Sequence, residues 1–131
     1  MNKKNTRKLL KDFPEFFNVT DPRQSLMCFG FICDDGWFDL IYKLCSDIKK
    51  ETSHLYPLEV LEVKEKFGGL RFYTGGGTKK MGDLIRKAEN DSFDICERCG
   101  KPGTLMVHNG WYKTVCPKCA KKEGYVELPK R

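Results

Sequence analysis

The chain has 131 residues, of which 40% are hydrophobic and 32% are charged, and its formal net charge is +6. This length and composition predict one globular body with a small satellite, not two full domains. No apolar run approaches the roughly 18 residues of a membrane-spanning helix, so we expect a soluble protein with no membrane partner. The first residues are charged and lack the apolar centre of an export signal, which favours the cytoplasm.

The positive charge is concentrated at the two ends of the sequence. Residues 1–11 carry a charge of +5, residues 12–95 carry −4 and residues 96–131 carry +5. Basic ends of this kind allow contact with nucleic acid, although a surplus of this size also occurs on ordinary soluble proteins.

The first third of the chain predicts two helices and one apolar segment between them. Leu9, Leu10, Phe13, Phe16 and Phe17 have helical spacing, which predicts a helix over residues 6–17 that Pro14 ends, kinks or restarts. Residues 26–33 form a continuous apolar run, typical of a buried strand or of a wall of the core. Apolar residues from 37 to 48 then recur at the spacing of an amphipathic helix.

Three aspartates, Asp34, Asp35 and Asp39, cluster where this second helix begins. A carboxylate at the N-cap accepts unpaired backbone N–H groups and lies at the positive end of the helix dipole, so we interpret the cluster as a cap. The alternative is a divalent-metal site for phosphodiester chemistry.

Residues 58–67 and 70–74 predict a β-hairpin with Gly68 and Gly69 as its two-residue turn. Alternation places Leu61, Val63 and, if it continues to the end of the strand, Phe67 on one face, and Val60, Glu62, Lys64 and Lys66 on the other. Glu62 and Lys64 match half of a metal-dependent nuclease motif, but an exposed pair on a solvated strand is the ordinary explanation. The stretch loosely resembles the aromatic strand of RNA-recognition sheets, but the order of residues does not fit that pattern. We therefore interpret Phe72 or Tyr73 as a core residue and not as a ring that stacks on bases, and the sequence leaves open which of the two faces outward.

Gly75, Gly76, Gly77 and Thr78 lead into a predicted helix over residues 79–90, which Gly77 or Thr78 caps. A glycine-rich loop before a helix can bind an anion through free N–H groups. This loop lacks the spacing of a nucleotide-binding P-loop, so a flexible connection is the simpler interpretation.

The most specific motif is a pair of Cys-x-x-Cys sequences formed by Cys96, Cys99, Cys116 and Cys119. Four thiolates can close a tetrahedral shell around one Zn²⁺ ion, which leaves no open position for water and makes the site structural. The spacing between the pairs is typical of such modules. Disulfides are the alternative, but a cytosolic location favours metal. We expect the other thiols, Cys28, Cys33 and Cys45, to lie in the core.

The segment between the two cysteine pairs predicts one hairpin. Residues 104–108 and 111–115 flank Asn109-Gly110, a strong signal for a type I′ turn. Pro117 and Gly124 then mark the start and end of a short helix that carries the second cysteine pair. The sequence therefore predicts an α+β fold, with an α/β body over residues 1–95 and a four-cysteine zinc finger over residues 96–131 packed on it. A treble clef is favoured over a zinc ribbon, in which no helix follows.

Three motifs occur in order: DDGWFDLIYKLC, VKEKFGGLRFYTGGG, and a helix running into CERCGKPG and GWYKTVCPKC. With them, residues 28–120 resemble a family of small bacteriophage and prophage proteins that has no assigned function. The resemblance implies a phage-encoded cytosolic protein with a small α/β body and a C-terminal zinc finger. It carries no catalytic residues. In that family the last metal position is often His, and Cys119 replaces it here with zinc coordination intact.

Three classes of function follow. The favoured one is a non-enzymatic binding protein that contacts nucleic acid or a host protein, for example as an inhibitor of host defence. The second is a metal-dependent nuclease of the His-Asn-His type, with His108 as the candidate general base and Asn109 beside it, although no His or Asn after Cys119 completes a catalytic metal site. The third is a structural phage component. Trp37, Phe38 and Trp111 could build the core or a homo-oligomer interface, and periodicity does not separate these two uses.

Overall fold

The computed structural model describes residues 1–51 and 55–129. Its fold is mixed α+β, as predicted, with four α-helices and two separate antiparallel sheets among the described residues. The elements are α1 (Lys3–Asp12), α2 (Phe38–Lys50), β1 (Leu58–Lys66), β2 (Gly69–Gly76), α3 (Lys79–Asp91), β3 (Thr104–His108), β4 (Trp111–Val115), α4 (Pro117–Glu123) and β5 (Val126–Glu127). Short 3₁₀ turns are η1 (Met27–Phe29), η2 (Asp35–Trp37) and η3 (Ser92–Asp94). None of the described helices is long and apolar enough to cross a membrane.

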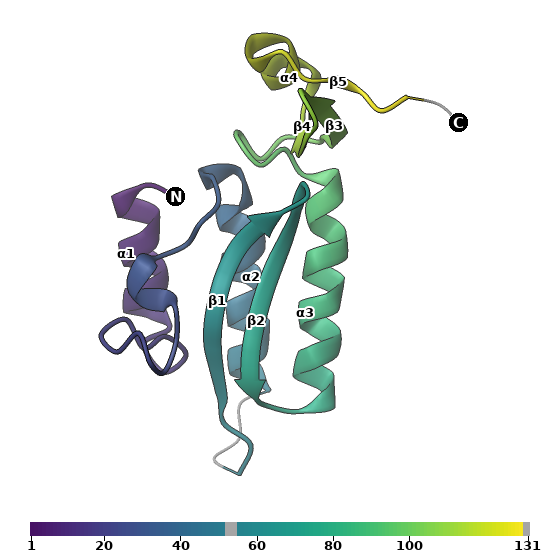
Figure 1. Cartoon of the computed structure of the whole chain (residues 1–131). Helices are drawn as coiled ribbons and strands as arrows, with labels where there is room; N and C mark the ends of the chain where they lie inside the picture. Colours follow the sequence, from purple (N-terminus) through teal and green to yellow (C-terminus); the bar gives the residue numbers. More distant parts are fainter. Residues whose placement is uncertain (52–54, 130–131) are drawn as a thin grey trace.

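The body is a long β1–β2 hairpin that packs one face on α2 and α3, with α1 beside α2 (Figure 1). Burying this face removes apolar surface from water, which is the main stabilising term of such a small unit. The core is one contiguous cluster that includes Leu9, Phe16, Met27, Trp37, Ile41, Ile48, Val60, Val63, Leu70, Phe72, Met81 and Ile85.

The β1–β2 hairpin differs from its prediction in two ways. A β-bulge between Val60 and Glu62 inserts one extra residue, so Val60 and Val63 both face the core, and the predicted alternation is wrong there. Lys66 pairs with Gly69, so the turn is Phe67-Gly68, with φ of 53° and 86°, and not Gly68-Gly69.

Helix α1 begins and ends earlier than predicted. Asn2 caps its N-terminus by accepting a hydrogen bond from the Asn5 amide at 2.8 Å. The helix ends at Asp12 because Pro14 disfavours helical geometry at Phe13. Phe16 and Phe17 still enter the core, but from the turn after the helix.

The apolar run of residues 26–33 is not a strand. It forms η1 and then runs beside β1, where Ile32 makes one isolated bridge to Lys64. Met27, Phe31 and Cys33 line the core. Cys28 points outward and is exposed, which corrects its predicted burial, whereas Cys33 and Cys45 are buried as expected.

Helix α2 follows its prediction, with Ile41, Leu44, Cys45 and Ile48 buried. The predicted aspartate cap is wrong, because neither η2 nor α2 has a side-chain hydrogen bond at its N-cap. Asp35 instead accepts hydrogen bonds from the Asn2 amide at 2.8 Å and the Asn5 amide group at 3.1 Å. Asp39 lies in the first turn of α2, where its charge suits the helix dipole.

Helix α3 begins at its predicted cap, since Thr78 Oγ1 accepts a hydrogen bond from the Met81 amide at 3.3 Å. Gly75 and Gly76 belong to β2, so the three glycines do not form a free loop. Met81, Ile85 and Ala88 are the buried stripe of the helix.

The C-terminal part contains the predicted hairpin and helix and forms its own small hydrophobic cluster. Asn109 and Gly110 connect β3 and β4 with φ of 49° and 81°, as a type I′ turn requires. Gly124 ends α4 in the left-handed conformation. The sequence did not predict β5, which pairs with β3 through Val126 and Glu127.

Candidate functional site

The four predicted metal ligands lie close together in the structure. The sulfur atoms of Cys96, Cys99, Cys116 and Cys119 all lie within 4.8 Å of one another. A tetrahedral zinc–thiolate shell with bonds of about 2.3 Å separates its sulfurs by about 3.8 Å, and Cys99 and Cys116 Sγ are 3.6 Å apart. The donor set and its size therefore fit one tetrahedral metal ion.

Two backbone segments hold these cysteines. The first is a tight turn in which the Cys96 amide donates to Lys101 O at 2.7 Å and the Gly100 amide donates to Cys96 O at 2.9 Å. Gly100 has a φ of 82°, a conformation that glycine adopts without strain. The second is the start of α4, where Cys116 is the N-cap and Cys119 lies in the first turn.

Hydrogen bonding prepares the Cys116 thiol for metal. The Cys119 amide donates to Cys116 Sγ at 3.4 Å, and this bond is the main cause that lowers the pKa of the Cys116 thiol to about 6. Metal ligands must be thiolates, so this environment favours the binding form of Cys116, whereas burial raises the pKa of the Cys119 thiol to about 12. Cys96 and Cys116 are buried, whereas Cys99 is exposed.

A buried polar network joins this site to the body, and sequence reasoning missed it. Glu97, between the first two cysteines, is only 2% exposed, and its Oε2 accepts a hydrogen bond from the Asp34 amide at 3.0 Å. Its Oε1 is 3.3 Å from Lys113 Nζ. Burial raises the pKa of the Glu97 carboxyl, and the nearby Lys113 charge opposes that rise.

Asp34 has its role in this network. Its carboxylate forms ion pairs with Arg98 and Lys113, each at 3.1 Å, and Arg98 also pairs with Glu123 of α4 at 2.7 Å. Charged residues between two cysteines suggest solvent exposure, so the sequence had no signal for this arrangement. The network joins the four-cysteine unit to the body.

Backbone contacts strengthen the same junction. The Gly36 amide donates to Glu97 O at 2.7 Å, and Trp37 Nε1 donates to Ile95 O at 2.9 Å. On the other side, Thr114 Oγ1 donates to Gly68 O at 2.7 Å in the turn of the β1–β2 hairpin. This bond joins β4 to that turn.

His108, the candidate general base, is bonded within the C-terminal unit. Its Nδ1 donates to Gly124 O at 2.9 Å, and its ring lies 5.5 Å from that of Tyr125. Among the described residues, His108 belongs to no group of three or more metal-ligating side chains, and the four cysteines form the one such group. Its visible role is to join the end of β3 to the end of α4.

The other candidates remain apart from the cysteines. Glu62 and Lys64 lie on β1 and pair with each other at 3.3 Å. Tyr73 is 40% exposed and Phe72 is in the core, so Tyr73 is the ring of this pair that faces outward.

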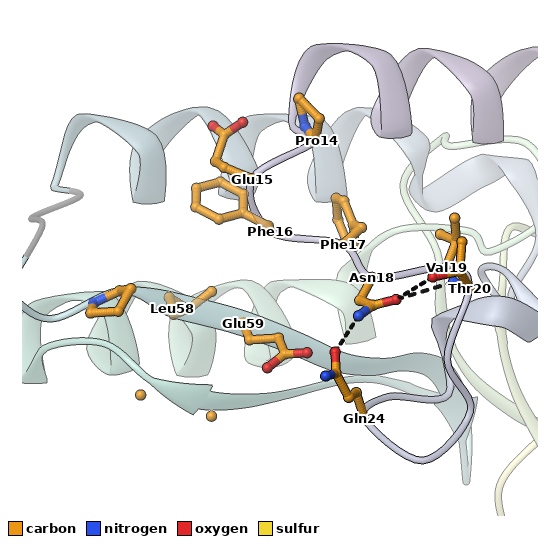
Figure 2. Close-up of a pocket in the computed structure, with 13 residues that line it drawn as sticks. Pro14, Glu15, Phe16, Phe17, Asn18, Val19, Thr20, Gln24, Leu58 and Glu59 are labelled. Carbon is orange, nitrogen blue, oxygen red and sulfur yellow. Dashed lines mark hydrogen bonds between the residues drawn. The ribbon is translucent and has the colours of Figure 1, made fainter.

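A cavity of about 830 Å³ lies at the other end of the body, between the turn after α1 and the β1–β2 hairpin (Figure 2). Figure 2 shows Glu15 and Phe16 on one wall and Leu58 and Glu59 of β1 on the other. Asn18 orders its rim, with Oδ1 accepting from the Thr20 amide at 3.1 Å. The two carboxylates make this cavity unsuitable for a polyanion.

Comparison of the chain with models of protein families, with curated protein sequences and with solved structures finds no match, so the resemblance to a phage family stays a prediction.

Proposed function

We propose that the protein is a non-enzymatic binding module, stabilised by one structural zinc ion, whose partner is nucleic acid. The observation that carries the proposal is that the four cysteine sulfur atoms lie within 4.8 Å of one another. This spacing suits tetrahedral coordination of one zinc ion. A closed thiolate shell offers no position for substrate, so the ion serves the fold. We also propose that this unit is a treble clef, because its cysteines lie on a turn and on the start of a helix, with a hairpin between them.

Nucleic acid is the favoured partner because cations without ion pairs remain on the elements near both ends of the chain. On α1, Lys3, Lys4, Arg7 and Lys11 have no ion pair with a described residue, and on α4 the same holds for Lys118, Lys121 and Lys122. Electrostatic attraction to phosphates supplies most non-specific affinity for nucleic acid.

The first experiment is native mass spectrometry of protein purified from a bacterial cytosol without added metal. We expect one zinc ion per chain. Cys99→Ser and Cys116→Ser should lose it, whereas Cys28→Ser, an exposed thiol outside the cluster, is the matched control and should keep it. Stoichiometric zinc in both ligand variants would contradict the assignment.

The second experiment measures binding of labelled oligonucleotides at several salt concentrations. We expect affinity to fall steeply with salt through counterion release, and removal of residues 1–11 to reduce that slope. Zinc-loaded protein that binds no oligonucleotide would redirect the search to a host protein.

A further inference from the structure

We propose that the outer face of the β1–β2 hairpin, together with the two hairpin tips, binds single-stranded nucleic acid by stacking bases on Tyr73, Phe67 and Trp111. This inference rests on the proposed function and names the form of the nucleic acid and the surface that holds it. We call this surface the aromatic face; it consists of Glu62, Lys64, Lys66, Phe67, Arg71, Tyr73, Trp111 and Tyr112.

The strand register assembles one part of the face. Lys64 is opposite Arg71, and Glu62 is opposite Tyr73. The neighbouring pair, Val63 and Phe72, points into the core, so these side chains point away from it. Figure 1 shows α2 and α3 on the core side of the hairpin and no helix over its outer side.

Two hollows lie along this face, each with an exposed ring. One, of about 280 Å³, is bounded by Tyr73, Leu26 and Leu61. The other, of about 460 Å³, lies between the two hairpin tips and is lined by Phe67, Trp111 and Tyr112. Phe67 is 65% exposed and Trp111 is 75% exposed.

Cationic side chains lie beside the exposed rings of both hollows. Lys64 Nζ lies 5.8 Å from the centre of the Tyr73 ring, and Lys66 Nζ lies 5.7 Å from that of Phe67. Arg71 has no ion pair with any residue that the structure describes. Glu62 is paired with Lys64. With Glu65 counted, three cationic side chains (Lys64, Lys66 and Arg71) lie near two carboxylates, so the surface has a small net positive charge. Glu65, on the core side, also lines the second hollow, where it accepts a hydrogen bond from the Gly68 amide at 2.6 Å.

The backbone conformation of Phe67 is an independent indication that its ring binds a ligand. Phe67 has a φ of 53°, a left-handed conformation that bulky residues rarely adopt. The other hairpin places Asn109 at the equivalent turn position, where a short polar side chain is favoured. An exposed ring held in a strained turn adds no core contact, which indicates a binding role.

Rings beside cations favour single strands over duplexes. Bases inside a duplex are stacked on one another, whereas bases of a single strand are free to stack on aromatic side chains. The four-residue distance along β1 from Glu62 to Lys66 spans about 13 Å, which is room for about four stacked nucleotides. Cations between the rings would then lie near the phosphates.

The test measures fluorescence anisotropy of the full, zinc-loaded protein with labelled oligo-deoxythymidine and oligo-uridine of about 12 nucleotides, and with a duplex of the same length. We expect at least about tenfold tighter binding of a single strand than of the duplex. Tyr73→Thr and Phe67→Asn should each weaken single-strand binding by about fivefold or more. Arg71→Ala should reduce the salt dependence, whereas Lys50→Ala, an equal charge change on α2, should not.

Phe67→Asn should also change stability, in the opposite direction to affinity, because asparagine adopts the left-handed backbone conformation of this turn with less strain. We expect its thermal unfolding midpoint to rise while its affinity falls, a combination that loss of folding cannot produce. Phe29→Asn is the matched control, since Phe29 is 67% exposed and lies in η1 outside both hollows. It should leave affinity unchanged.

The outcomes separate the two proposals. If single strands and duplex bind with equal affinity, and Phe67→Asn and Tyr73→Thr bind as tightly as the wild type, the proposed role of the aromatic face is wrong. The proposal that the protein binds nucleic acid would still hold. Absence of binding to every oligonucleotide would overturn both.

Discussion

At the scale of single residues, Gly36 shows how closely the C-terminal unit approaches the body. A Cβ atom added at Gly36 would lie 2.1 Å from Cys96 O, which is a backbone atom that cannot move aside easily. We therefore expect Gly36→Ala to destabilise the protein by about 1–3 kcal/mol in urea unfolding. It should also weaken zinc binding, because Cys96 must shift.

Gly82→Ala is the matched control for this prediction. Gly82 lies within α3, and its nearest neighbour, 3.5 Å from an added Cβ, is the flexible guanidinium of Arg86. Alanine should stabilise this helix by about 0.5–1 kcal/mol. Equal stability of the two variants would refute the close approach at Gly36.

A second residue-scale prediction concerns Asp12 and pH. Its carboxylate accepts hydrogen bonds from Tyr42 Oη at 2.6 Å and Lys8 Nζ at 3.1 Å, and these bonds, first that of Tyr42, lower the Asp12 pKa below its ordinary 3.8. A lowered pKa contributes stability above the unfolded pKa, and that stability is lost as pH falls through the folded pKa. Tyr42→Phe should therefore lower the urea midpoint at pH 7, and the difference should narrow below pH 3.8.

The same titration with Tyr73→Phe serves as the control. No hydrogen bond joins the Tyr73 hydroxyl to a residue that the structure describes, so its urea midpoint should follow the wild-type curve at every pH. A constant difference for Tyr42→Phe across the pH range would show that packing, not the Asp12 bond, is responsible.

At the scale of elements, the cap of α3 can be tested directly. Thr78 Oγ1 accepts a hydrogen bond from the Met81 amide, and the helix carries three core residues, Met81, Ile85 and Ala88. We expect Thr78→Ala to cost about 1 kcal/mol in urea unfolding, because an N–H group loses its partner. Thr78→Ser keeps the hydroxyl and should retain most of the stability; identical losses in both variants would exclude the cap.

Elements defined by local signals could be predicted from the sequence. The spacing of apolar residues located α2, Asn109-Gly110 located the second hairpin, and the Cys-x-x-Cys pairs located the metal cluster. Each of these signals acts within a few residues and needs no knowledge of the rest of the fold.

Features that depend on tertiary contact could not be predicted. Gly69 resembles a turn residue but is glycine because an added Cβ would lie 2.2 Å from the Phe93 ring. Gly68 meets Leu105 of the C-terminal unit in the same way, at 2.3 Å. Asp34 was interpreted as a cap because its partners, Arg98 and Lys113, lie far away in the sequence.

At the scale of the whole molecule, the protein has two hydrophobic clusters. The larger is built from α1, α2, the β1–β2 hairpin and α3, and the smaller contains Cys96, Met106, Val115, Cys116 and Ala120. The smaller cluster has few apolar side chains. If the four cysteines hold the proposed zinc ion, we expect this cluster to depend on it for stability, because metal binding and folding are coupled in such sites.

We therefore expect a zinc chelator to unfold the C-terminal unit and leave the body folded. Hydrogen exchange should show loss of amide protection in β3, β4 and α4, with protection retained in α2, β1 and α3. Loss of protection in all six elements together would show that the two clusters unfold as one unit.

Thiol labelling gives an independent measure of the same event. Two of the seven cysteines, Cys28 and Cys99, are exposed. Cys28 lies outside the cluster and should react first, whereas Cys99 and the other three ligand thiols should react after chelation. Cys33 and Cys45 should react only in denaturant, because burial hides both thiols and raises the pKa of Cys33 to about 12. Cys45 is a buried residue of α2. Its early reaction would mean that the body had opened together with the metal site.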